Sequence, residues 1–211
     1  MSRSIITLAA IVSLLVPTFG QTPNQSPGQS NCVTTIQSPA VRGIKLGMTA
    51  EEVFALFPGS SERPENKNAI LSAEQPPNYG IASLSFQPST YPSPVKERFA
   101  AIDSVFIRLF DGRVTEIRVE YAGPNSHPRG PAWNNVDDFI AKLSESFALP
   151  GAKLWFETSQ YSKTLRCGAF EMDATTSNRQ GAIWLRNSAY GDTVRQRAAA
   201  DEEKRRRDFK P

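Results

Sequence analysis

Histidine, cysteine and long apolar runs are all scarce in this sequence of 211 residues. The only histidine, His127, cannot build a histidine metal site alone, and nothing around it indicates a Ser–His–Asp triad. No Asp-x-Asp-x-Asp-Gly calcium loop occurs. The acidic pairs Glu51-Glu52 and Asp137-Asp138 suit the first turns of helices, because helix neighbours point about 100° apart and cannot oppose each other across a substrate. We therefore assign no catalytic residue, no metal ligand and no cofactor.

A single long apolar run extends from Ile5 to Val16, with Arg3 before it. Pro17 interrupts the run, and small residues occupy the −3 and −1 positions of a cut before Gln21, the pattern of a secretory signal. A membrane anchor would need about 20 apolar residues, and a lipoprotein would need a cysteine at the cut. We expect residues 1–20 to be a cleavable signal peptide and the mature protein to be soluble, secreted or periplasmic, with no transmembrane segment.

The chain has two cysteines, Cys32 and Cys167, and both follow the predicted cut. An even pair in an oxidising compartment forms a disulfide by default. Thiol catalysis or metal binding would need a histidine or a second ligand pair, which the sequence does not indicate. We therefore expect a disulfide between the start of the domain and a strand in its second half.

The formal net charge of +3 comes from the end of the chain. Residues 195–211 hold seven basic and four acidic side chains, whereas residues 21–194 hold sixteen basic and seventeen acidic ones. The body is close to neutral, so we expect no nucleic-acid partner. The four consecutive cations of the tail are a candidate weak contact to anionic membrane surfaces, and the alternative is a solvated helix paired internally with the acids at 201–203. These cations are Lys204, Arg205, Arg206 and Arg207.

Residues 21–39, rich in Pro, Ser and Gln, predict a flexible linker before one domain at 40–190. Thr49 and Glu52 form a capping box, which predicts a short helix that a Pro-Gly pair ends. A long loop rich in Pro, Asn and Ser is expected next, and a strand at Ile81–Phe86 follows it.

The clearest strand pair is the hairpin Asp103–Tyr121, whose turn contains Asp111-Gly112. A two-residue loop would place charged residues opposite apolar ones. A three-residue loop with Gly112 left-handed instead pairs Val105 with Ile117. We therefore expect a bulged hairpin.

The second half begins with a helix capped by Asn135, since apolar residues recur after it at helical spacing up to Phe147. Three strand candidates follow this helix. They are Lys153–Glu157, Leu165–Ala174 and Gly181–Arg186.

These elements predict an α+β fold with two main helices packed on one mostly antiparallel sheet of about six strands. The charged tail, residues 191–211, is expected to be a polar helix without an apolar docking face, because acids precede bases by four residues in it. The halves 40–122 and 132–190 each contain a capped helix followed by about three strands. This pattern favours a tandem α-β-β-β repeat, but capped amphipathic helices also resemble each other by convergence, so the question stays open.

The segment Gly43 to Val53 (GIKLGMTAEEV) resembles the helix entry of small outer-membrane lipoproteins of the SmpA/OmlA type and of β-lactamase-inhibitor-like domains. The tandem arrangement is similar to that of the two-repeat inhibitors, and the whole chain resembles uncharacterised bacterial exported proteins. The resemblance implies a protein-binding or envelope-assembly role and carries over no functional residue. The chain departs from the lipoproteins because it has no cysteine at the predicted cut.

The three tryptophans Trp133, Trp155 and Trp184 are a candidate binding surface, although strand tryptophans more often fill a core. We expect an exported, non-enzymatic protein that binds another macromolecule, either a protein or an envelope component. The alternatives are an extracytoplasmic hydrolase whose site only folding assembles, and an envelope-associated assembly protein. An enzyme should gather titratable side chains in a pocket, whereas a binding module should expose aromatic side chains on the open face of its sheet.

Overall fold

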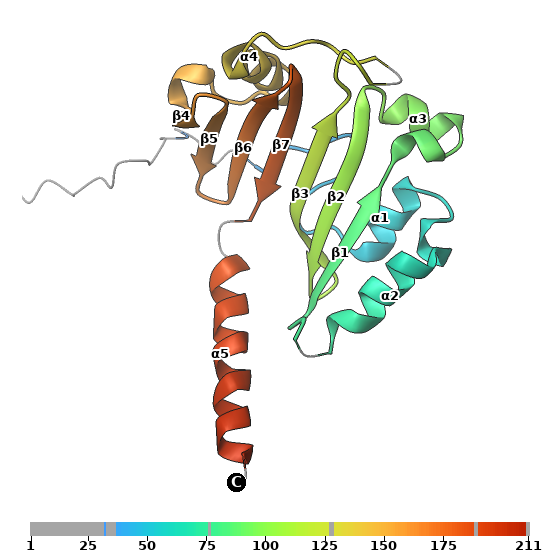
Figure 1. Cartoon of the computed structure of the whole chain (residues 1–211), viewed down its shortest axis with the longest axis vertical. Helices are drawn as coiled ribbons and strands as arrows, with labels where there is room; N and C mark the ends of the chain where they lie inside the picture. Colours follow the sequence, from blue (N-terminus) through green and yellow to red (C-terminus); the bar gives the residue numbers. More distant parts are fainter. Residues whose placement is uncertain (1–31, 33–36, 76, 127–128, 188–189, 210–211) are drawn as a thin grey trace, which may run out of the picture.

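A seven-stranded antiparallel sheet organises the fold in our computed structural model, which describes residues 32, 37–75, 77–126, 129–187 and 190–209 (Figure 1). The strands are β1 (Ile81–Phe86), β2 (Ile102–Phe110), β3 (Arg113–Tyr121), β4 (Phe156–Ser159), β5 (Ser162–Cys167), β6 (Phe170–Ser177) and β7 (Gln180–Arg186). The α-helices are α1 (Ala50–Leu56), α2 (Pro64–Ala73), α3 (Ser93–Arg98), α4 (Val136–Phe147) and α5 (Tyr190–Asp208). The predicted signal peptide, most of the predicted linker and His127 lie outside the described residues.

The predicted α+β class with an antiparallel sheet is confirmed, with seven strands where about six were expected. The predicted strand Leu165–Ala174 is wrong as one element, because a turn at residues 168–169 divides it into β5 and β6. The strand expected at Lys153–Glu157 begins later, at Phe156, because residues 152–154 form a short 3₁₀ helix.

The strand order β1-β2-β3-β7-β6-β5-β4 brings the two halves of the chain together at the centre of the sheet. Each half is a meander of neighbouring strands, and β3 of the first half pairs with β7 of the second, with Ile117 opposite Leu185. The two meanders therefore share one sheet. The tandem repeat stays a prediction.

The helices α1, α2 and α4 lie on one face of this sheet and cover its core (Figure 1). Alternate residues of β2, namely Val105, Ile107 and Leu109, are fully buried on that side, whereas Phe106 and Arg108 between them are exposed. In the part of the chain that the structure describes, the only helix that touches the opposite face is α5, whose first residue Tyr190 packs on Phe110 at the edge of that face. We call this face the open face.

The capping box that predicted α1 is confirmed. The amide of Thr49 donates to the Glu52 carboxylate at 2.7 Å, and the amide of Glu52 donates to the Thr49 hydroxyl at 3.3 Å. Phe57, directly after the helix, stacks on Phe86 of β1 with ring centroids 4.2 Å apart. The cap therefore fixes the start of α1, and Phe57 after its end anchors the helix to the sheet.

The long loop expected after α1 is wrong, because ten of its residues fold as α2. Pro64 occupies the first turn, where a proline costs no hydrogen bond, and the buried side chain of Asn66 donates to the carbonyl of Ser60 at 2.8 Å. The apolar residues of α2 are small or only partly buried, so the sequence lacks the apolar stripe by which amphipathic helices are recognised.

The predicted hairpin exists, but its predicted register is wrong. Asp111 and Gly112 both have positive φ, of 50° and 73°, so the loop has two residues and not three. A bulge at Thr115 then shifts the pairing by one residue, and Val105 faces Val119 in place of Ile117. The bulge restores the match of apolar faces that a longer loop was expected to supply.

The helix predicted from Asn135 is confirmed as α4, since the Asn135 side chain accepts from the amide of Asp138 at 2.9 Å. Its buried Phe139 lies directly over Gly181 of β7, where a Cβ atom would come within 2.7 Å of the ring. The glycine therefore allows α4 to approach the sheet closely.

The expected disulfide is present. Cys32 and Cys167 are bonded, with their Cα atoms 5.4 Å apart. Cys167 is the last residue of β5 and is buried, so the bond ties the segment before the domain to the second half of the sheet. A disulfide is consistent with an extracytoplasmic location.

The polar tail helix is confirmed as α5, which leaves the sheet after β7 and has no buried residue (Figure 1). Two of its three expected acid–base pairs form, Asp201–Arg205 and Glu202–Arg206. Arg197 also binds the turn between β2 and β3, with its two terminal nitrogens each 2.7 Å from a carboxylate oxygen of Asp111. Among the described residues, no helix combines the length and apolar character needed to cross a bilayer.

Candidate functional site

The open face carries a row of alternating charges that crosses five strands, which we call the charged row. Cross-strand pairing places its members side by side in the order Arg108, Glu116, Arg186, Glu171 and Arg166. Opposite charges on directly facing positions attract, and salt bridges join three of the four neighbouring pairs. Glu116 lies within 3.0 Å of Arg108, and Glu171 contacts both Arg186 and Arg166.

A second row beside it contains the exposed aromatic side chains, and we call it the aromatic row. Phe106 of β2 faces Arg118 of β3, which in turn faces Trp184 of β7. Phe106 and Trp184 remain 40% and 39% exposed, the largest values for aromatic residues within the described strands. Exposed aromatic side chains that gather on one face of a protein are typical of interaction sites.

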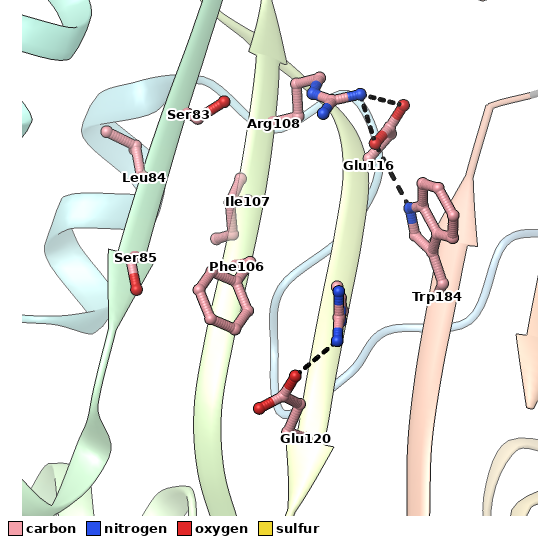
Figure 2. A pocket seen from close by; sticks show the side chains of 10 residues that line it. Ser83, Leu84, Ser85, Phe106, Ile107, Arg108, Glu116, Glu120 and Trp184 are labelled. Atoms are coloured by element: carbon pink, nitrogen blue, oxygen red, sulfur yellow. Dashed lines mark hydrogen bonds and ion pairs between the residues drawn. The ribbon is translucent and has the colours of Figure 1, made fainter. Parts of the chain in front are cut away.

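The two rows hold the Trp184 ring in a fixed position. Its indole nitrogen donates to the Glu116 carboxylate at 3.3 Å, and the Arg186 guanidinium lies 4.6 Å from the ring centroid. Figure 2 shows Glu116 between Arg108 and the indole nitrogen, so a single carboxylate orients both side chains. The ring is therefore preorganised while much of its surface remains exposed.

Two open hollows flank Trp184. One, of about 430 Å³, is lined by Phe106 and residues of β1 to β3 (Figure 2), and the other, of about 490 Å³, is lined by residues of β5 to β7. Both include Arg118 and Trp184 in their walls. A partner that covers Trp184 would therefore contact both halves of the sheet.

We compared the chain with known proteins. No protein-family model, no curated protein and no solved structure matches it. The resemblance to the outer-membrane lipoproteins and the β-lactamase-inhibitor-like domains accordingly stays a prediction.

The open face contains four guanidinium groups and four carboxylates, which balance. Arg118 pairs with Glu120 at 2.7 Å and Arg186 pairs with Asp173 at 3.0 Å, in addition to the contacts of the charged row. Each carboxylate of the face thus accepts from an arginine, and each guanidinium carries five N–H donors. Within the described residues, no three metal-binding side chains lie close enough to hold an ion.

The three tryptophans of the candidate surface lie in three different places. Trp155 is buried, and its indole donates to the carbonyl of Pro150 at 3.1 Å. Trp133 packs on Phe139 of α4 with ring centroids 5.1 Å apart, on the covered side of the sheet. Of the three, Trp184 belongs to the open face.

The basic cluster of the tail lies on α5, which follows β7 in the chain. Arg205 contacts Asp201 and the Tyr79 hydroxyl, and Arg206 pairs with Glu202 at 3.1 Å. Among the described residues, Lys204 and Arg207 form no salt bridge. The cluster is therefore half neutralised by its own helix and by the loop before β1.

Sequence reasoning missed most of the site. Phe106, Arg108 and Glu116 lie in the predicted hairpin, where their alternation with apolar residues marked an exposed face, but nothing local identified their neighbours. Arg186 and Glu171 enter through the pairing of β7 with β3 and with β6. The pairing of β7 with β3 joins Glu116 to Arg186, about seventy positions apart, which no local pattern specifies.

Proposed function

We propose that this protein is an exported, non-enzymatic module that binds another protein through the open face of its sheet. The observation that carries the proposal is the pair of exposed aromatic rings, Phe106 and Trp184, held in a frame of paired charges. Tryptophan and arginine are the residues most enriched at the energetic centres of protein interfaces.

The charge balance of the face favours a protein partner over a polyanion. Nucleic acids are bound by surfaces with an excess of cations that neutralise phosphates. Here each arginine of the charged row has a carboxylate beside it, from Arg108 with Glu116 to Arg166 with Glu171. Such a mixed polar surface around aromatic side chains resembles the composition of protein interfaces.

The same pairing argues against the hydrolase alternative on this face. A general base or nucleophile needs a carboxylate that is free to accept a proton or to attack. Glu116, whose side chain is 11% exposed, accepts from both Arg108 and Trp184, and Glu171 accepts from two arginines. These contacts favour an orienting role for the carboxylates.

The experiment is a comparative capture. The wild-type chain and the variant Phe106→Ala/Trp184→Ala are immobilised, and the extracytoplasmic fraction of the native organism is passed over both. We expect a partner that the wild type retains and the double variant loses, with a drop in affinity of about 30-fold or more for an interface centre of this kind.

The matched control is Tyr161→Ala, which removes an exposed aromatic side chain (61% exposed) from the turn between β4 and β5. It should retain the partner as the wild type does. If the double variant and the wild type retain the same proteins in equal amounts, the open face is not the binding surface and the proposal is wrong.

A further inference from the structure

A cavity of about 600 Å³ lies on the covered side of the sheet, away from the open face. Residues of α4 form one wall, and the turn at 40–43 with Tyr121, at the end of β3, forms another. Cavities that hold small molecules commonly have volumes of roughly 300–1,000 Å³. The volume therefore suits a small molecule better than a macromolecular segment.

The walls of this cavity are largely aromatic and apolar. The rings of Tyr121 and Trp133 both pack on Phe139, with centroids 5.5 and 5.1 Å away. Leu143 and Phe147 continue the same wall along α4. An apolar chain or ring would find contacts on several sides here.

One cation at the cavity has no counter-charge among the described residues. Arg42 lies in a tight turn in which Val41 and Ile44 exchange backbone hydrogen bonds of 2.9 and 3.0 Å, and its φ is 53°. Its guanidinium is exposed and donates only weakly, to the carbonyl of Ala100 at 3.4 Å. None of the described residues that line the cavity is acidic.

The positive charge of Arg42 affects the ionisation of the Tyr121 hydroxyl. Burial raises the pKa of Tyr121 to about 12, and the charge of Arg42 acts in the opposite direction. Arg42 and Tyr121 line the same cavity, so the guanidinium lies at the edge of the apolar wall. The other cation of the lining, Lys142, already pairs with Glu145.

Trp133 contributes its ring to the cavity and not its polar atom. Its indole nitrogen is buried, with less than 1 Å² of accessible surface. A ligand in the cavity would therefore contact the ring, and the lining cation Arg42 is the group that can pair with a charged end.

We propose that this cavity binds a small amphiphilic carboxylate. The apolar body lies against Tyr121, the Trp133 ring and the α4 wall, and the carboxylate pairs with the Arg42 guanidinium. This site is separate from the open face, so the proposal does not depend on the proposed protein binding.

The test measures the binding of three probes of equal chain length, octanoate, octan-1-ol and octylammonium, by isothermal titration. Octanoate should bind tightest and octylammonium weakest. Arg42→Gln should weaken octanoate binding about tenfold, as the loss of one charge-assisted pair does, and should leave octanol binding unchanged. Ser146→Trp, at an exposed lining position of α4, should fill the cavity and abolish both.

Two control variants keep the test decisive. Lys96→Gln removes an exposed cation from α3 that does not line the cavity, and it should bind octanoate like the wild type. Trp184→Ala should do so too, because it alters the open face alone. Melting temperatures confirm that each variant folds. Equal affinities for octanoate and octanol, an unchanged affinity in Arg42→Gln, or no binding of any probe would overturn the proposal.

Discussion

At the scale of single residues, Glu116 links the two rows of the open face. It is the least exposed carboxylate of its row, and it accepts from Arg108 of the first half and from Trp184 of the second. A carboxylate removed from water in this way depends on its donors, because an unpaired buried charge is costly. The cost of removing a donor should therefore rise with the burial of its partner.

This dependence predicts different stability losses for two neighbouring arginines. Arg108→Ala leaves Glu116 with one donor fewer and should lower the free energy of unfolding by about 1–2 kcal/mol. Arg118→Ala releases Glu120, whose side chain is 30% exposed and can be solvated instead, so the loss should stay below about 1 kcal/mol. Urea denaturation measures both. Equal losses would mean that burial of the carboxylate does not set the cost.

At the scale of elements, features coded within a few residues were predictable. The capping box of α1 and the Asn135 cap of α4 depend on residues three positions apart. The register of the β2–β3 hairpin was not predictable, because its bulge depends on a distant residue. The carbonyl of the bulged Thr115 accepts a hydrogen bond from the amide of Asn187, beyond β7, at 2.9 Å. The place of Trp184 on the open face likewise depends on β7 lying between β3 and β6.

The docking of helix α5 was likewise not predictable from the sequence, because polar side chains attach the helix to the domain. Its Arg197 binds Asp111 and lies 4.3 Å from the ring centroid of Phe110. Gly80 permits this approach, because a Cβ atom there would come within 2.4 Å of the Asp111 carboxylate. A polar helix without an apolar stripe can therefore dock on a turn that presents an acid and an aromatic ring.

The attachment of α5 should weaken in acid. Hydrogen bonds from Arg197 hold the pKa of Asp111 below its ordinary value, and Arg205 and Tyr79 do the same for Asp201. A depressed folded-state pKa stabilises docking above the ordinary value and loses that effect as pH falls through the lowered one. Hydrogen exchange in α5 should therefore accelerate relative to the sheet below about pH 4.

At neutral pH, Arg197→Ala should produce the same acceleration with little change in the melting of the sheet. Arg195→Ala is the matched control, because Arg195 pairs with Asp192 within the helix and not with the domain. If Arg197→Ala leaves exchange in α5 unchanged, the Asp111 contact does not hold the helix.

At the scale of the whole molecule, the candidate binding face is a joint product of both halves of the chain. Arg108 and Glu116 come from the first meander, and Trp184, Arg186 and Glu171 come from the second. The face exists only where β3 pairs with β7. Any interaction that keeps the second meander paired with the first therefore also preserves the open face.

The disulfide is one such interaction, and we predict the effect of removing it. Cys32 and Cys167 close a loop of 135 residues that spans α1 to β5. Cross-links over long loops stabilise mainly by restricting the unfolded chain, so the variant Cys32→Ser/Cys167→Ser should lose about 2–4 kcal/mol of unfolding free energy. Urea denaturation of oxidised wild type and variant measures the difference, and reduced wild type should match the variant. A variant as stable as the oxidised wild type would contradict this account, because it would mean that the bond leaves the unfolded chain no more restricted than before.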